Sequence, residues 1–224
     1  KLAESLQIDL IGRSRGLKLV VTKEYIHETL TIAEKPYRFK LYDTGFTQPN
    51  TRVNEKMIGW VKTHIGTYES DLLELYCGHG NFTIPLSAQF DKVLATEISK
   101  RSIQSAKENC KLNGVENIAF VRLSAEELTE ALAGKRSFRR LEGVDLGAYQ
   151  FSHLFVDPPR AGLDEMTRTF AQQFETILYI SCNPETLLRD LEFFKERYEI
   201  VRFAVFDQFA YTRHLECGVI LQRR

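Results

Sequence analysis

The amino-acid sequence predicts an α/β protein built on a doubly wound, mostly parallel sheet, with an antiparallel C-terminal strand and a small β-rich segment before it. From residue 71 onward, short β-rich runs alternate with amphipathic stretches of helical period, which is typical of the strand–helix–strand units of parallel sheets. The last two β-rich runs differ, because only a short connection separates them and strands joined in this way pair antiparallel.

The first 46 residues have no helical period and form the β-rich segment. They contain three short runs rich in strand-forming residues, LKLVVT (17–22), ETLTIA (28–33) and YRFKLY (37–42). We predict that residues 1–46 are the tail of a separate module, truncated at its beginning, and that residues 47–224 form the main domain. The sequence FTQPN marks the break between the two, and VNEKMIGWVKTHIG (53–66) predicts the helix that leads into the sheet.

The parallel sheet accounts for the centre of the chain. Its predicted strands are DLLELYC (71–77), KVLATE (92–97), IAFVRL (118–123), FSHLFVD (151–157) and ILYIS (177–181). After the second strand, Ile103, Ala106 and Cys110 lie near helical spacing, and Gly114 predicts the end of that helix. We expect residues 135–150 to be a surface insertion, and the sequence IVRFAVFDQF followed by HLECGVILQ to form the antiparallel pair at the sheet edge. Such an ending is typical of class I methyltransferases and is absent from most dinucleotide-binding folds.

Composition narrows the class of protein. Apolar residues make up 43% of the 224 residues and charged residues 27%, without a long apolar run, so we expect a soluble globular protein with no membrane segment. The four cysteines are far apart and form no C-x-x-C pair, which indicates neither a metal site nor a disulfide framework and favours the cytoplasm. Thirty basic residues balance thirty acidic ones, so binding of nucleic acid would depend on local patches. Nothing in the sequence indicates an obligate protein partner.

A candidate cofactor site follows the first strand of the parallel sheet. In CGHGNF (77–82), Gly78 and Gly80 allow a tight turn and close approach of the backbone to a ligand. Thr83 stands where a dinucleotide-binding loop has its third glycine, so a cofactor without a pyrophosphate fits better. Glu97, at the end of the second strand, is placed to accept hydrogen bonds from two ribose hydroxyls; the alternative is a solvated strand end. S-adenosylmethionine (SAM) has a ribose and no phosphate, and therefore suits this loop.

The fourth strand ends in VDPPR (156–160), where two prolines stiffen the chain after Asp157. In a methyltransferase fold this loop is the place where the acceptor base meets the cofactor. Arg160 follows the prolines where amine-methylating enzymes commonly have an aromatic residue, and its guanidinium suits a uracil carbonyl or a phosphate. His79 has no second metal ligand nearby and is interpreted as a loop residue.

Cys182 is the candidate nucleophile. It ends the fifth strand and precedes the helix PETLLRDLEFFKE, so it emerges at the same sheet edge as Glu97 and Asp157. A thiol at a helix N-terminus is expected to have a lowered pKa, which favours the thiolate. The alternative for Cys182 is a buried structural cysteine, which is the interpretation we adopt for Cys77, Cys110 and Cys217.

Glu216 is the candidate base. It begins the last strand after a polar break, and partial desolvation there would raise its pKa; the alternative is a plain surface turn.

These segments together resemble the RNA (uracil-C5)-methyltransferase family, and most closely its tRNA branch. The resemblance extends over the whole chain and is carried by FTQPN, LELYCGHGNF, ATEI, FVDPPRAGLD, YISCNPETL and FDQFAYTRHLECGV. It implies that SAM contacts Gln48, Tyr76, Asn81, Glu97 and Asp157, beside the turn at Gly78, that Cys182 is the nucleophile and that Glu216 is the base. His79 departs from the family, whose loop usually reads G-N-G-N, and the family's substantial N-terminal segment is not in this sequence.

The resemblance implies a function as well. We expect transfer of a methyl group from SAM to C5 of the T-loop uridine in tRNA, through a covalent adduct between Cys182 and C6. The alternatives are methylation of rRNA or another structured RNA, a SAM enzyme acting on cytosine or an amine, and a module that binds SAM and RNA without catalysis. We expect the T-arm of tRNA to contact basic groups such as Arg13, Arg15, Lys18 and the segment 135–140, which could equally be solvated.

Overall fold

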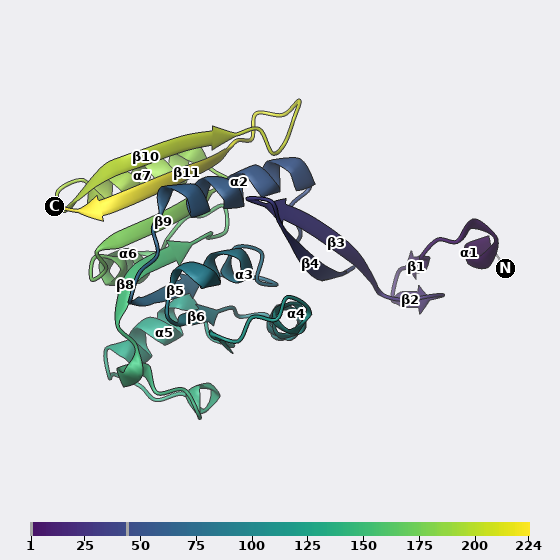
Figure 1. Cartoon of the computed structure of the whole chain (residues 1–224), viewed down its shortest axis with the longest axis horizontal. Coiled ribbons are helices and arrows are strands. Elements are labelled where there is room, and N and C mark those ends of the chain that lie inside the picture. The colour runs from purple at the N-terminus through teal and green to yellow at the C-terminus, as the bar shows by residue number, and fades with distance from the viewer. Residues whose placement is uncertain (1, 44) are drawn as a thin grey trace.

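The fold is centred on a seven-stranded sheet (Figure 1). It is described by a computed structural model that covers residues 2–43 and 45–224. In spatial order the strands are β10 (Tyr198–Phe206), β11 (Glu216–Arg223), β9 (Thr176–Ser181), β8 (Phe151–Val156), β5 (Asp71–Leu75), β6 (Val93–Thr96) and β7 (Ile118–Val121). The strands from β9 to β7 are parallel, and β11 pairs antiparallel with both β9 and β10. The predicted fold class is therefore confirmed.

Helices cover both faces of the sheet. One face is covered by α2 (Thr51–His64), α3 (Thr83–Leu86) and α4 (Lys100–Leu112), and the other by α5 (Ala125–Leu132), α6 (Glu165–Ala171) and α7 (Pro184–Phe194). Successive strand residues point to opposite faces, so Leu72 and Leu73 enter different apolar clusters. Burial on both faces explains why these strands are almost wholly apolar. Short 3₁₀ helices η1 (Ser87–Gln89), η2 (Arg139–Leu141) and η3 (Leu146–Ala148) complete the domain.

The N-terminal residues form two hairpins that differ in how they contact the domain. The hairpin of β3 (Tyr25–Ile32) and β4 (Lys35–Tyr42) buries Leu30, Phe39 and their neighbours in the same apolar cluster as Met57 of α2. The hairpin of β1 (Ile11–Ser14) and β2 (Leu17–Val20) and the short helix α1 (Leu2–Leu6) project away from the sheet (Figure 1). The domain boundary after residue 46 stays a prediction.

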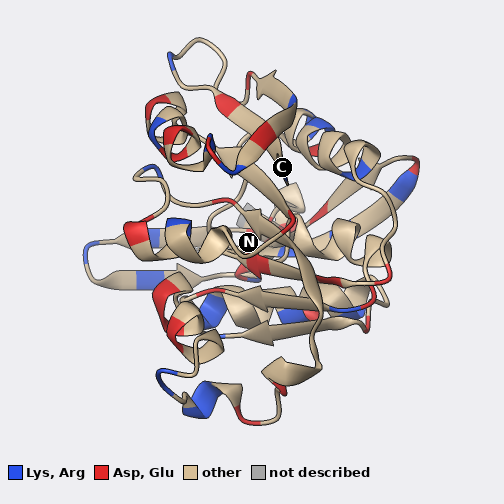
Figure 2. Cartoon of the chain, turned by 90° about the vertical axis from the view of Figure 1, so that its left-hand side faces the viewer, with Lys and Arg blue, Asp and Glu red and all other residues tan. Residues whose placement is uncertain are grey.

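Charged residues are interspersed over the molecule (Figure 2). Lys and Arg alternate with Asp and Glu along the helices and at the strand ends, as the equal numbers of basic and acidic residues lead one to expect. Across residues 2–43 and 45–224, no helix combines the length and the apolar character needed to cross a membrane.

Candidate active site

A cavity of about 670 Å³ lies at the carboxyl ends of the parallel strands. All nine residues that the sequence singled out line it: Gln48, Tyr76, Gly78, Asn81, Glu97, Asp157, Arg160, Cys182 and Glu216. They come from six parts of the chain, and four of these parts meet because parallel strands end at one edge of a sheet. A cavity of this volume is in the range of sites for small molecules and cofactors.

The glycine turn and Glu97 form one end of this cavity. The backbone N–H of Gly78 donates to Glu97 Oε2 at 3.2 Å, and that of Ser99 donates to Oε1 at 2.8 Å. Gly78 and Gly80 have φ values of +56° and +87°, which glycine adopts without strain. A carboxylate oxygen can accept further hydrogen bonds. Glu97 is therefore held in a fixed orientation and keeps acceptor capacity for a ligand hydroxyl.

Two side-chain amides near the cavity are held by partners that the sequence did not single out. Asn81 and Asn54 of α2 exchange two hydrogen bonds of 2.9 Å. Gln208, which is buried in the connection after β10, donates from Nε2 to Oε1 of Gln48 at 2.8 Å. This contact leaves the amide N–H groups of Gln48 as the donors for a ligand.

Three carboxyl groups around the cavity, those of Glu74, Asp157 and Glu216, have strongly raised pKa values. Burial, followed by the charge of Glu216, raises the pKa of Asp157 to about 8. Burial also raises the pKa of Glu74 to about 8, with a smaller contribution from Asp157. Glu74 lies on β5, and its Oε2 has no hydrogen-bond partner among the described residues. It was missed in the sequence, although a lone charged residue inside the apolar strand DLLEL is a usable signal.

Cys182 lies between the end of β9 and the start of α7, as predicted, and is partly buried. Asn183 caps α7, accepting from the backbone N–H of Glu185, and Pro184 occupies the first turn. The expected lowering of the Cys182 pKa was wrong. Burial and the carboxyl groups of Glu216 and Asp157 raise the pKa of the thiol, and this outweighs the opposing charge of Arg160. Cys77, Cys110 and Cys217 are buried free cysteines, in agreement with the structural interpretation.

Glu216 is the first residue of β11 and only 2% exposed. Its Oε2 has no partner within the described part of the chain, and burial raises its pKa to about 7. The predicted desolvation of this carboxyl group is therefore confirmed. Its charge contributes to the raised pKa of both Asp157 and Cys182, which places the three groups close enough to interact.

The loop that carries Arg160 is fastened to the helix that follows Cys182. The Arg160 carbonyl accepts from Asn183 Nδ2 and from Thr186 Oγ1, each at 3.1 Å. The guanidinium of Arg160 points to the last loop of the chain, where Nη2 lies 3.3 Å from Nδ1 of His214. The candidate nucleophile and the candidate substrate-binding arginine are thus held on one framework.

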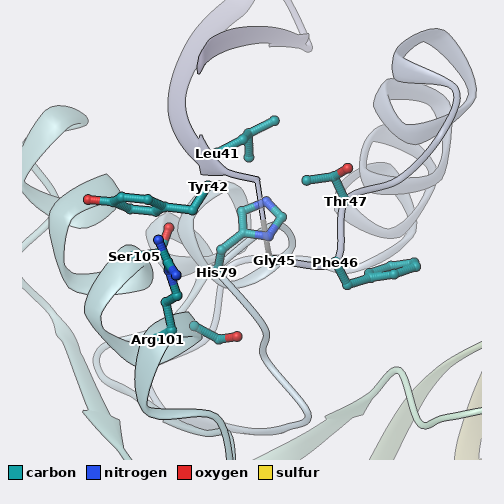
Figure 3. Close-up of a pocket in the computed structure, with 9 residues that line it drawn as sticks. Leu41, Tyr42, Gly45, Phe46, Thr47, His79, Arg101 and Ser105 are labelled. Atoms are coloured by element: carbon teal, nitrogen blue, oxygen red, sulfur yellow. The ribbon is translucent and has the colours of Figure 1, made fainter. Parts of the chain in front are cut away.

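His79 is partly buried and packs against neighbouring side chains. Its ring lies between the end of β4 and residues 45–47, near Arg101 and Ser105 of α4 (Figure 3), and packs edge-on against Phe39 at 5.7 Å. Burial lowers the pKa of His79 to about 4, so the ring is neutral at pH 7. Among residues 2–43 and 45–224, no group of three or more His, Cys, Asp or Glu side chains is placed to hold a metal ion.

The residues present fit SAM. The ligand is cationic, and Glu74, Glu97, Asp157 and Glu216 all line this one cavity, with an unpartnered carboxyl oxygen on Glu74 and on Glu216. Phe46 and Ile98 also line the cavity and provide apolar walls for a planar ring.

The arrangement of the sheet and the position of this cavity are those of the class I SAM-dependent methyltransferase fold. Within that class, the chain belongs to the tRNA (uracil-5-)-methyltransferase family, whose model matches residues 1–224. It is 56% identical over 223 residues to a tRNA/tmRNA (uracil-C(5))-methyltransferase of Nitratiruptor sp. and 54% identical to one of Aliarcobacter butzleri. Both matches include 100% of this chain, which spans 62% and 60% of the two relatives' own lengths.

Solved structures agree with this assignment. The chain is similar to the Pyrococcus abyssi tRNA (uracil-54, C5)-methyltransferase in complex with S-adenosyl-L-homocysteine, with a TM-score of 0.70 and 26% identity over 89% of this chain and 44% of that one. It also shares its fold with M. jannaschii TYW2 in complex with AdoMet, with a TM-score of 0.56 and 16% identity over 96% of this chain and 94% of that one.

Proposed function

We propose that this chain carries the catalytic part of an enzyme that transfers a methyl group from SAM to C5 of the T-loop uridine in tRNA. The observation that carries the proposal is one cavity that combines a cysteine and a buried carboxyl group, Cys182 and Glu216, with the glycine turn and Glu97. Family membership and the tRNA/tmRNA (uracil-C(5))-methyltransferase relatives support the same reaction. In this proposal residues 47–224 are the catalytic domain, and residues 1–46 are the tail of a module that contacts RNA.

The chemistry explains the need for a thiol. C5 of uracil is a weak nucleophile, but addition of the Cys182 thiolate to C6 moves the electrons of the C5=C6 bond into an enolate over C5, C4 and O4. Gln48, Tyr76, Asn81, Glu97 and Asp157 would hold SAM, which would provide an electrophilic methyl group for C5. Arg160 faces the same cavity and can donate to O4 or to a phosphate.

Glu216 completes the reaction. After methylation C5 carries both a methyl group and its original hydrogen. The Glu216 carboxylate accepts this hydrogen as a proton, the C5–H electrons restore the C5=C6 bond, and the bond between C6 and the sulfur of Cys182 breaks. A pKa near 7 suits a carboxylate that must be ionised yet remain a good base at neutral pH.

The RNA must present an unstacked base to this cavity, so the target nucleotide is flipped. Several of the basic side chains considered for RNA contacts are engaged in ion pairs within the protein. Arg13 pairs with Asp43, and Lys18 pairs with Asp43 and Glu24. In the segment 135–140, Arg140 pairs with Glu127. Phosphate binding by these groups would exchange one anionic partner for another, so we expect their individual contributions to affinity to be small.

The direct test is release of tritium from C5-labelled uridine in a tRNA transcript, with and without SAM. We expect SAM-dependent release from the wild-type chain and none from Cys182→Ala, which should still bind SAM because the thiol is not needed to hold the cofactor. Tritium release that persists in Cys182→Ala would show that Cys182 is not the nucleophile. A wild-type chain that binds SAM and RNA and releases no tritium would indicate a binding module without catalysis. Methylation of cytidine in a matched transcript would indicate that the enzyme acts on cytosine.

A further inference from the structure

Among the residues that the structure describes, Tyr211 is the most exposed large hydrophobic residue, and its backbone has a positive φ. It lies in the loop between β10 and β11, with a relative exposure of 107% and a φ of +66°. A turn encloses it, because the backbone N–H of Thr212 donates to the Phe209 carbonyl at 3.1 Å and Thr212 Oγ1 donates to the same oxygen at 2.7 Å. Glycine is the residue that favours this position, since its φ can be positive without strain.

The fold offers no compensation for this arrangement. Positive φ is unfavourable for a residue with a bulky side chain, and an aromatic ring left in water adds no burial in return. Strain of this kind persists where a side chain is needed for something other than stability. The ring of Tyr211 is therefore displayed outward at the expense of the backbone.

The loop that carries this ring adjoins the active-site cavity. Three residues after Tyr211, the His214 ring meets the guanidinium of Arg160, and two residues further on Glu216 lines the cavity. His214 is itself held, since its backbone N–H donates to Thr212 Oγ1 at 3.1 Å. Figure 1 shows the loop extending past the end of β10. We therefore expect an RNA strand that delivers a base to Cys182 and Glu216 to run near this loop.

We propose that Tyr211 is a stacking platform for an unpaired nucleobase next to the methylated nucleotide. The proposal rests on the proposed function and adds a contact outside the reacting atoms. Flipping a nucleotide leaves its neighbours unstacked, and an exposed tyrosine ring gives one of them a new stacking partner without reading its identity. Arg213 is exposed next to it and makes no ion pair among the described residues, so it is available to a phosphate of the same strand.

The test compares Tyr211→Gly and Tyr211→Phe with the wild-type chain on a T-arm hairpin transcript. We expect Tyr211→Gly to raise KM for the RNA about tenfold, which is the size of one base–aromatic stacking contact, and to leave kcat and SAM affinity unchanged. We expect its melting temperature to be equal to or above that of the wild type, because glycine relieves the strain. Tyr211→Phe keeps the ring and should retain the wild-type KM.

Glu34→Gly is the matched control, since Glu34 is exposed in the turn between β3 and β4 with a φ of +64° and does not line the cavity. It should change stability in the same direction and leave KM for RNA unchanged. A wild-type KM in Tyr211→Gly, or a loss of stability and SAM binding in that variant, would overturn the stacking role. If the wild-type chain does not methylate the hairpin, both the proposed function and this inference fail. If the wild type is active and Tyr211→Gly has the same KM, only the inference fails.

Discussion

The charges around Cys182 oppose its ionisation. The N-terminus of α7 and Arg160 favour the thiolate, but burial and the carboxyl groups of Glu216 and Asp157 raise the pKa of the thiol above its usual value. The charge of Glu216 raises the pKa of Cys182, and Glu216 itself has a pKa of about 7. Ionisation of one group therefore depends on whether the other is protonated. A protonated Glu216 makes the thiolate easier to form, and an ionised Glu216 is the form that the proposed reaction needs at its last step.

This linkage predicts how the rate depends on pH. Burial raises the pKa of Glu216, so the fraction of ionised base falls as the pH drops through 7, whereas an ordinary carboxylate would stay ionised down to about pH 4. The thiolate fraction falls in the same direction. Under single-turnover conditions we expect formation of free methylated RNA to rise continuously between pH 5.5 and 9. A rate that is level between pH 5.5 and 8 would contradict the assignment of these two groups.

Glu216→Gln separates the two ionisations. Without the base the methylated RNA should remain attached to Cys182, so the adduct can be followed on a denaturing gel. Because the carboxylate that helps to raise the pKa of Cys182 is gone, adduct formation should reach half its maximum rate at a lower pH than product formation by the wild type. Free product formed at the wild-type rate would exclude Glu216 as the base.

The sequence predicted side chains that lie at strand ends and missed a side chain that holds a predicted site residue in place. Cys182 and Asp157 were found because each follows an apolar strand directly. Gln208 was not found, since its contact with Gln48 joins residues 160 positions apart and has no local pattern. The direction of the Cys182 pKa was wrong for the same reason: the helix start is visible in the sequence, whereas the opposing carboxyl groups come from other strands.

Among the elements, the loop after β8 and helix α7 behave as one unit. Asp190 of α7 is fully buried and accepts from the backbone N–H of Leu163 at 2.9 Å and from the Tyr179 hydroxyl at 2.7 Å. Gly162 makes this close contact possible. It has a φ of +72°, and a Cβ added to it would lie 2.7 Å from Asp190 Oδ2 and from Arg189 Nη2.

Gly162→Ala should therefore damage both stability and substrate binding. Asp190 is held on several sides and cannot move away cheaply, so we expect a loss of about 2–4 kcal/mol in the free energy of unfolding. The displaced loop carries Arg160, so KM for RNA should rise more than KM for SAM. Gly143→Ala is the matched control, because Gly143 has a φ of +85° with no atom within 4 Å of an added Cβ. Equal effects of the two changes in denaturant titrations and kinetics would show that contact with α7 is unimportant.

Element type was predictable where one signal dominates. The five parallel strands were found because burial on both faces makes them continuously apolar, and α4 was found from its apolar spacing. Strand β1 was not predicted, since its four residues, IGRS, are mostly exposed and are fixed only by pairing with β2. The position of the β3–β4 hairpin against α2 and α4 was likewise beyond a local pattern.

At the scale of the molecule, α4 joins that hairpin to the cofactor end of the cavity. Asn109 has no exposed surface, and its Oδ1 accepts from the backbone N–H of Lys40 on β4 at 2.7 Å. Its Nδ2 donates to the carbonyl of His79, between the two glycines of the turn, at 3.1 Å. One turn further along α4, Asn113 exchanges hydrogen bonds of 2.9 and 2.7 Å with the backbone of Arg38 on β4. The hairpin and the glycine turn thus share one support.

This shared support predicts that Asn109→Ala weakens cofactor binding at a distance. The change leaves two partly buried backbone groups without these partners, at Lys40 and His79. The loss should cost about 2–4 kcal/mol in the free energy of unfolding and free the turn that carries Gly78. We expect the Kd for SAM, measured by calorimetry, to rise severalfold. Asn113→Ala loosens the same hairpin but has no contact with the turn, so it should lower the melting temperature slightly and leave that Kd unchanged. If both variants bind SAM as the wild type does, the turn is rigid without support from α4. If both variants bind SAM equally weakly, the hairpin itself supports the turn, and the hydrogen bond from Asn109 to His79 is not the cause of the weaker binding.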